Sequence, residues 1–499
     1  MKYTFLLLSN LLIFSVSAQQ LQLESNQKQV KLFAKTITQE DLKKHLTIYA
    51  SDEFEGRETG EAGQKKAVDY LKTQYVTMGI EPAQKSGDYF QKFNLTIKKI
   101  PTGTLTINGN TYDNGNEYMS FTGIDASNET IEYVGYGLET DYVNNDVTNK
   151  IVLIKAGEPV GQTTDWGKSS EGLELKLNLA RSKGAKAVLY IDQDYFNRMK
   201  RRFDYMKAND SGRMSIDALS SNSIPTLFLT TKMATSIYEA FENNSTAQLL
   251  DTSIVIDLES TDTKVATENV VAYIQGTTFP DEYVIISSHL DHVGVNDEGE
   301  IHNGADDDGS GTVALLEIAE AFKAAADKGK GPDRSVVFLH VTGEEKGLLG
   351  SQYYTDANPV FELNKTIANL NIDMVGRIDP KREGDRNYVY LIGSDKLSTE
   401  LHEISELVND KFMNIELDYT YNDENDPNRF YYRSDHYNFA KNNIPIIFYF
   451  NGTHDDYHKP SDTVEKINFD LLENRTRLVF HTAWEVANRS KAIIADKAK

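Results

Sequence analysis

Residues 283–291, YVIISSHLD, form an apolar run that ends in a histidine and an aspartate. The run has the length and the β-branched content of a strand, so we predict a strand over residues 283–288. His289 and Asp291 then lie at its carboxyl end. Ligands of open α/β sheets gather beyond the carboxyl ends of the strands, which makes this position a candidate functional site.

Strands and helices alternate along the chain on both sides of this run. Further strands are expected at residues 270–275, 335–341, 367–372, 388–392 and 444–450, and helices at 309–325, 347–356, 397–408 and from 469 toward 493. Such alternation is typical of doubly wound α/β folds. We therefore expect a doubly wound, mostly parallel mixed sheet flanked by helices.

Two other segments have a different character. Residues 38–83 carry a helical pattern, in which a helix over 63–78 is expected to stop at Gly79. Residues 97–257 contain short strands and turns with few candidate catalytic groups. A chain of 499 residues is too long for one ordinary core. The predicted organisation is a signal peptide at 1–18, the N-terminal part of the main domain at 19–112, an inserted β-rich domain at 113–261, and the rest of the main domain at 262–499.

The N-terminus has the pattern of an export signal. Lys2 precedes an apolar stretch at 5–14, and residues 16–18, VSA, form a small-residue cleavage site. A membrane anchor needs a longer apolar run than this one. We therefore expect an exported protein, periplasmic or secreted, with no membrane association once the signal is cleaved.

Composition excludes several classes of function. The chain has no cysteine, which rules out disulfides, thiolate metal sites and cysteine nucleophiles. Its formal net charge of -23 makes nucleic acid a poor partner, because phosphate binding requires clustered Lys and Arg.

Three more of the expected strands end in metal-binding residue types. The strand at 335–341 is followed by Glu344 and Glu345, the strand at 367–372 by Asp373, and the run at 444–450 by a loop that carries His458. Four strands therefore deliver imidazole or carboxylate groups to the same edge of the sheet.

An acidic loop, GADDDGSG at residues 304–311, lies between the first two of these strands. Three adjacent carboxylates repel one another, and a helix cap formed by Asp308 or Ser310 accounts for only one acid. Cations would neutralise the others. Calcium prefers cages made only of oxygen, whereas imidazole together with carboxylate suits zinc. Two zinc ions about 3.5 to 4 Å apart would share one carboxylate and hold a hydroxide between them.

Five stretches together resemble one known family. They are SHLD at 288–291, GADDDGSG at 304–311, GEEKGL at 343–348, NIDM at 371–374 and YHKPSDT at 457–463. This set resembles the co-catalytic di-zinc aminopeptidase family, which includes secreted bacterial leucyl aminopeptidases, glutamate carboxypeptidase and glutaminyl cyclase. The middle block, with VGYG at 134–137 and KGAKA at 183–187, resembles a protease-associated (PA) domain.

The resemblance implies a role for each matching residue. One zinc would be bound by His289, Asp307 and Asp373, and the other by Asp307, Glu345 and His458. Glu344 would be the general base, and Asp291 would orient His289 through its second ring nitrogen. Candidates near the substrate are Tyr457 as an oxyanion donor, and Arg433 and His436 as substrate-binding residues.

The implied activity is that of an aminopeptidase acting on peptides. Asp306, Asp423 and Glu424 suit a free α-amino group. A carboxypeptidase or dipeptidase would need cationic side chains for the substrate C-terminus, for which Arg429 and Arg433 are candidates. Glutaminyl cyclases work with one zinc, whereas both ligand triplets are intact here. A binding protein without catalysis would have lost the base or a ligand, and neither is lost.

Overall fold

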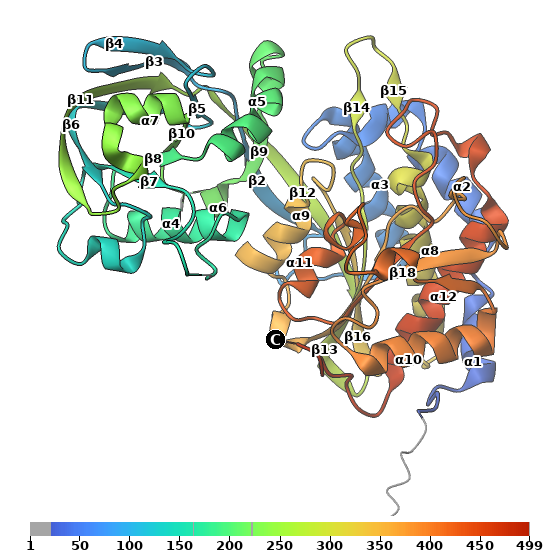
Figure 1. The fold of residues 1–499 in the computed structure, drawn as a ribbon. Helices are drawn as coiled ribbons and strands as arrows, with labels where there is room; N and C mark the ends of the chain where they lie inside the picture. Colours follow the sequence, from blue (N-terminus) through green and yellow to red (C-terminus); the bar gives the residue numbers. More distant parts are fainter. Residues whose placement is uncertain (1–20, 163, 221–222, 499) are drawn as a thin grey trace, which may run out of the picture.

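The computed structural model of the chain describes residues 21–162, 164–220 and 223–498. These residues form two lobes, of which the larger contains both ends of the described chain and the smaller contains its middle (Figure 1). The predicted signal peptide at 1–18 lies outside the described residues. Within the part of the chain that is described, no helix is long and apolar enough to cross a membrane.

A mixed sheet forms the centre of the larger lobe. Its strands follow the order β19 (Glu416–Asp418), β18 (Tyr388–Ile392), β20 (Ile446–Phe450), β17 (Thr366–Ile372), β13 (Phe279–His289), β16 (Arg334–Val341), β12 (Asp262–Ile274), β2 (Phe90–Lys98) and β9 (Arg213–Ile216), with β1 (Glu81–Pro82) paired to β12. The central strands β20, β17, β13 and β16 are parallel to one another. The outer strands β12 and β18 run antiparallel to their central neighbours.

Helices cover both faces of this sheet. Successive strand residues point to opposite sides, and both sides carry apolar side chains that pack against helices. Ile286 packs into a core with α1 (Gln27–Ala34), α2 (Gln39–Tyr49), α3 (Ala62–Met78), α8 (Gly311–Asp327), α10 (Thr399–Val408) and α12 (Phe469–Asn488). The adjacent Ile285 faces the other way, toward α11 (His436–Ala440) and the helical turn Tyr353–Ala357 that continues α9 (Leu349–Gln352). The predicted α/β architecture is confirmed.

The smaller lobe has its own sheet and its own core. The strand order is β4 (Asn110–Asp113), β3 (Thr102–Ile107), β11 (Gln248–Glu259), β6 (Ile124–Tyr133), β7 (Ile151–Lys155), β8 (Ala187–Ile191), β10 (Thr226–Leu229) and β5 (Tyr118–Ser120). One face packs against α7 (Thr231–Ile237) and the other against α4 (Ser170–Ser182). A further helix, α5 (Gln193–Ala208), packs beside β5.

The smaller sheet begins before the boundary expected at residue 113. Strands β3 and β4 belong to it, so the chain leaves the larger lobe directly after β2 and returns between β11 and β12. Strands β2 and β12 pair antiparallel, with Lys98 opposite Asp262, which brings the two crossings side by side. The middle block also gives one strand, β9, to the edge of the larger sheet, where it pairs with β2.

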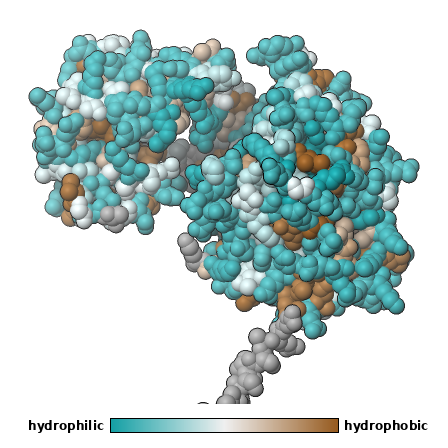
Figure 2. Space-filling view, turned by 45° about the vertical axis from the view of Figure 1, so that its right-hand side comes forward, coloured by the Kyte–Doolittle hydropathy of each residue, from teal (hydrophilic) through white to brown (hydrophobic). Residues whose placement is uncertain are grey.

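The visible surface is mainly hydrophilic on both lobes, and hydrophobic residues gather in small areas of the larger lobe (Figure 2). This agrees with a chain that carries 75 acidic and 52 basic residues.

Candidate metal centre

The candidate site lies at the carboxyl edge of the four parallel strands. His289 is the last residue of β13, and Asp373 directly follows β17. Glu344 and Glu345 lie in the loop after β16, and His458 lies in the loop after β20. The register of parallel pairing therefore brings residues that are far apart in sequence to one place.

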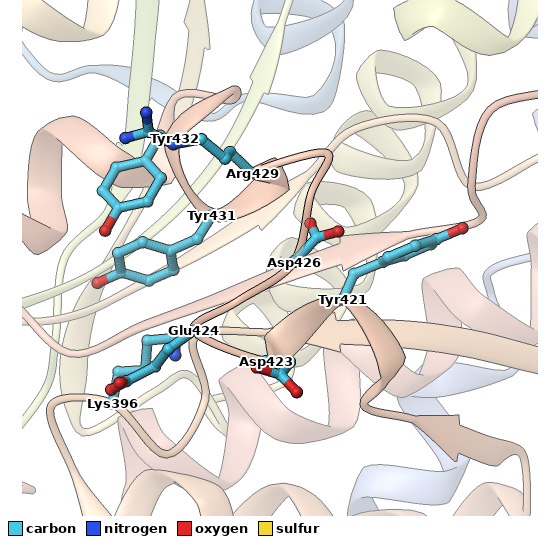
Figure 3. Close-up of a pocket in the computed structure, with 8 residues that line it drawn as sticks. All are labelled: Lys396, Tyr421, Asp423, Glu424, Asp426, Arg429, Tyr431 and Tyr432. Carbon is cyan, nitrogen blue, oxygen red and sulfur yellow. The ribbon is translucent and has the colours of Figure 1, made fainter.

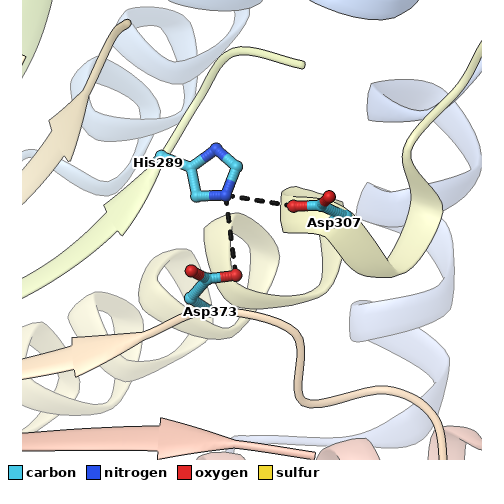
Figure 4. Close-up of side chains that lie close together, drawn as sticks. All are labelled: His289, Asp307 and Asp373. Atoms are coloured by element: carbon cyan, nitrogen blue, oxygen red, sulfur yellow. Dashed lines mark ion pairs between the residues drawn. The ribbon is translucent and has the colours of Figure 1, made fainter. Parts of the chain in front are cut away.

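His289, Asp307 and Asp373 form the first donor group. Nε2 of His289 lies 3.2 Å from Oδ1 of Asp307 and 3.6 Å from Oδ1 of Asp373 (Figure 4). All three side chains are buried, and one ligand atom from each fits around a single cation. The hydroxyl of Ser434 donates to Oδ2 of Asp373 at 2.6 Å and so holds that carboxylate in place.

Asp307, Glu345 and His458 form the second donor group. Nε2 of His458 lies 3.1 Å from Oδ2 of Asp307 and 3.0 Å from Oε2 of Glu345. Asp307 therefore turns one carboxylate oxygen toward each group. The structure brings together all five residues that the sequence patterns indicate, with Asp307 in the bridging position.

A sixth residue, His292, lies in the same place but is absent from the predicted ligand set. Its Nδ1 is 3.0 Å from Oε1 of Glu345 and 3.7 Å from Oδ2 of Asp307, and its side chain is fully buried. It can hold a cation together with these two carboxylates. The only available sequence signal is its place three residues after His289, in the motif HLDH.

The three aspartates of the acidic loop before α8 make different contacts, and those of Asp308 hold the loop in place. Asp308 caps the start of α8 by accepting from the backbone N–H of Gly311 at 2.9 Å. The same side chain accepts from the backbone N–H groups of His289 and Met374, which tie the loop to the ends of β13 and β17. Because Asp307 and Asp308 have non-helical backbone angles, the helix starts at Gly311, two residues later than expected.

The remaining acids expected to attract an α-amino group lie elsewhere. Asp306 turns away from the two donor groups: its carboxylate accepts from the backbone N–H of Gly376 at 2.7 Å and lies 3.2 Å from Nε2 of His454. Asp423 and Glu424 line a separate cavity of about 330 Å³, together with Lys396 and Arg429 (Figure 3). The acids that do line the pocket at the metal centre are Asp307, Glu344 and Asp373.

Asp291 acts differently from the expected role. His289 donates from Nδ1 to the backbone carbonyl of Asp291 at 3.0 Å, whereas the nearest carboxylate oxygen lies 3.8 Å away. The Asp291 carboxylate instead accepts from the backbone N–H of Glu344 at 3.2 Å and from the hydroxyl of Thr59 at 2.8 Å. The backbone of Asp291 thus orients the histidine, and its side chain holds the loop that carries Glu344.

The donor groups perturb one another's protonation strongly. Burial alone would lower the pKa of His458, but Asp307 and Glu345 raise it to about 10. Burial would raise the pKa of Asp307, yet His289 and His458 hold it well below its ordinary value. Burial raises the pKa of Glu344 well above its ordinary value, and Glu345 adds to the increase.

One wall of the pocket at this centre is apolar. Met374, Phe430, Phe448 and Phe450 line it and belong to one apolar cluster. Tyr457 also lines the pocket, with its ring stacked on that of His458 at 3.8 Å between centroids.

The two expected substrate-binding residues differ in position. Arg433 lines the pocket, and its guanidinium lies 5.0 Å from the ring centroid of Phe430. His436 does not reach the pocket: it is fully buried, donates from Nε2 to the carbonyl of Tyr431 at 2.8 Å, and stacks on Phe448 at 4.5 Å. Burial lowers its pKa to about 3. His436 therefore packs behind the pocket wall, and its side chain is not among the residues that line the pocket.

In this doubly wound α/β domain, one aspartate lies between two groups of imidazole and carboxylate donors, which are ordinary ligands of zinc. Residues 269–483 match the profile of Peptidase family M28.

Two curated relatives are similar over part of their length. Aminopeptidase YwaD of Bacillus subtilis (strain 168) is 28% identical over 216 residues, which cover 42% of this chain and 42% of that protein. The probable leucine aminopeptidase 2 of Aspergillus oryzae is 28% identical over 324 residues, which cover 63% of this chain and 53% of that protein. The chain thus spans about half the length of these relatives.

A solved structure shares the fold over nearly the whole chain. The aminopeptidase from Aneurinibacillus sp. strain AM-1 superposes with a TM-score of 0.51 at 20% identity, covering 93% of this chain and 98% of that one.

Proposed function

We propose that the chain is a zinc-dependent aminopeptidase that removes N-terminal residues from peptides. The observation that carries the proposal is the position of Asp307, which turns one oxygen to His289 and the other to His458. The match to a peptidase family supports a peptide substrate, and the names of the two curated relatives support cleavage at the N-terminus.

The donor atoms fit two zinc ions. Imidazole nitrogen and carboxylate oxygen are ordinary zinc ligands, and three protein ligands per catalytic zinc leave a position for substrate. Nε2 of His289 and Nε2 of His458 are buried, and neither has a hydrogen-bond partner among the described residues. Buried polar atoms without partners are rare, and a cation would satisfy both. When bound, such a pair of ions supplies Lewis acidity to the scissile carbonyl and lowers the pKa of a water molecule to about 7.

The chain's own residues supply the proton transfers. Glu344 lines the pocket beside Asp307 and Asp373, where it can take a proton from the attacking water and pass it to the leaving amine. The contact of its backbone N–H with Asp291 fixes its position. Tyr457 lines the same pocket and stays protonated, because burial and the surrounding acids raise its pKa. Its hydroxyl is our proposed hydrogen-bond donor to the tetrahedral oxyanion.

The pocket favours an apolar N-terminal residue with a free amino group. Phe430, Phe448 and Phe450 would pack against the first side chain, while Glu344 and Asp373 would face the positive amine. Arg433 is the one cationic side chain among the described residues that line the pocket, and its guanidinium lies over the ring of Phe430. A carboxypeptidase would require that cation to bind a C-terminal carboxylate, and the larger acidic set makes this the weaker alternative.

Two further parts of the proposal concern the rest of the chain. We propose that the smaller lobe is a PA-like domain that limits which peptides reach the cleft. We also propose that residues 1–18 direct export, so that the protein works in the periplasm or outside the cell.

The test compares leucine p-nitroanilide, its N-acetylated form and a peptide with a C-terminal glutamate, each before and after treatment with a chelator. We expect cleavage of the free-amine substrate only, loss of that activity on chelation, and recovery with added zinc. Preference for the blocked amine or the C-terminal glutamate would reject the aminopeptidase assignment.

A further inference from the structure

His292 has no role in the mechanism above, yet its environment is unusual. The side chain is fully buried, and neither ring nitrogen has a hydrogen-bond partner in the described part of the chain. About nine in ten or more buried polar groups have such a partner. A buried imidazole without one, directed at two carboxylates, requires an explanation.

The position of Nδ1 of His292 explains this environment. This atom lies 3.0 Å from Oε1 of Glu345, but the two atoms do not have the geometry of a hydrogen bond. Nε2 of His458 has the same relation to the other oxygen of Glu345, also at 3.0 Å and without a hydrogen bond. Ligand atoms around one tetrahedral zinc lie side by side about 3.4 Å apart, as bond lengths near 2.1 Å require. Each imidazole therefore lies at about the distance expected between two zinc ligands from one oxygen of Glu345, and the two rings lie 5.7 Å apart between centroids.

The fold builds this position from several elements. The backbone N–H of His292 donates to the carbonyl of Arg57 at 3.3 Å. The Arg57 guanidinium in turn donates to the carbonyls of Leu290 and Gly304, which joins the two segments that carry the donors. The ring of His292 lies against Gly304, where a Cβ would come within 2.5 Å of the ring carbon Cδ2. A glycine at the start of the acidic loop thus leaves room for the imidazole.

We propose that His292 is a fourth protein ligand of the second cation, beside Asp307, Glu345 and His458. The inference rests on the proposed function, because it requires that both donor groups hold zinc. With His292 as a ligand, the two zinc positions differ in their number of protein ligands. The second would have four protein ligands and would bind water or substrate only as a five-coordinate ion, whereas the first has three and keeps a more open position. We therefore expect the second zinc to be the more tightly held.

The test counts imidazoles and measures zinc affinity. X-ray absorption at the zinc edge of the protein loaded with two zinc ions should give an average of about 1.5 imidazoles per zinc, since three histidines serve two ions. His292→Ala should reduce this average to about 1 and weaken one of the two sites by more than 100-fold in titrations against a competing chelator. His292→Asn, which keeps a polar side chain, serves as the second variant should the alanine variant not fold.

The control is His402→Ala, which removes an imidazole on α10 that contacts Ser394 at 3.0 Å. It should leave the imidazole count and both zinc affinities unchanged. An average of about 1 imidazole per zinc in the unaltered protein would overturn the inference and leave the proposed function standing. A protein that binds fewer than two zinc ions before any substitution would instead reject the proposed function.

Discussion

Asp307 shows how one residue can organise a site. Its two oxygens face different donor groups, so its replacement should disturb both metals, whereas a residue that only moves protons should leave the metals in place. Glu344 is the residue to which we assign proton transfer, and it lines the same pocket as Asp307.

Glu344→Gln should keep two zinc ions and lose at least 100-fold in kcat, because general base catalysis contributes about 100- to 10,000-fold. Zinc content by elemental analysis and turnover of leucine p-nitroanilide measure the two effects. Glu345→Gln is the matched control, since it alters a neighbouring ligand and should lower zinc content as well. Retained turnover in Glu344→Gln would remove this residue from its role.

Glu317 on α8 makes stability depend on pH, away from the metal centre. It is fully buried, 3.6 Å from Nε2 of His45, and burial together with Glu320 and Asp41 raises its pKa to about 8. Its ordinary value is 4.5, so the folded state binds the proton more tightly, and stability is lost as pH rises from about 4.5 to about 8.

The glutamine in Glu317→Gln does not titrate, so this variant should not lose stability through this group as pH rises. We expect the variant to be more stable than the unaltered protein above pH 8, by on the order of 1–3 kcal/mol. Urea unfolding of both proteins at pH 5.5 and pH 8.5 measures the difference. If the unaltered protein and the variant changed in stability by the same amount between pH 5.5 and pH 8.5, Glu317 would not titrate in this window.

The residues of the site differ in how far sequence could indicate them. His289, Asp373 and Glu345 follow apolar strands, and this pattern is visible without coordinates. His292 and the burial of His436 depend on contacts with Gly304 and Phe448, which lie far away in sequence. The residue type of Asp291 does not indicate that its backbone carbonyl accepts a hydrogen bond from His289.

At the scale of elements, the long apolar and periodic runs predict strands and helices that the structure contains, and some of their ends differ from the expected residues. The strand expected at 388–392 is β18 with the same bounds, and the helix expected at 63–78 is α3. The smaller sheet begins at β3, before residue 113, and β3 alternates apolar and polar residues as strands of either lobe do, so the sequence pattern does not mark this crossing. The last helix ends at Asn488 rather than near residue 493.

Gly79 allows a prediction about one helix. It closes α3 in the left-handed conformation, with φ at 69°, and the nearest atoms to an added Cβ are on the flexible side chain of Lys323. Gly79→Ala should destabilise the protein by about 1–2 kcal/mol, because a side chain disfavours this backbone conformation. Urea unfolding measures the loss.

Gly331→Ala is the control, since its backbone is not in the left-handed region and an added Cβ would make only an ordinary contact with Ala326. It should have little effect on stability. Similar losses in both variants would mean that the left-handed cap is not the cause.

At the scale of the whole molecule, the chain crosses to the smaller lobe and back through the paired strands β2 and β12, and β9 of the middle block pairs with β2. Lys98 and Asp262 lie opposite each other, so a two-residue Asn-Gly turn could join β2 to β12 directly. The lobe also packs Met214, Ile216 and Leu219 against Phe93, Leu95 and Leu349. Its removal should therefore lower stability without altering the metal centre.

Replacing residues 99–261 by Asn-Gly tests this independence. We expect the shortened protein to bind two zinc ions and to cleave leucine p-nitroanilide within about tenfold of the original kcat/KM, because none of the donor residues lies in the removed part. Longer peptides should show the larger change in rate. A folded product that binds no zinc would mean that the smaller lobe helps to form the site.

The central claim is that Asp307 is shared by two cations, and diffraction tests it most directly. Crystals grown with zinc and measured on both sides of the zinc absorption edge should show two anomalous peaks about 3.5 to 4 Å apart, each within bonding distance of one Asp307 oxygen. One peak should adjoin His289 and the other His458. A single peak, or two peaks of which only one contacts Asp307, would contradict the account.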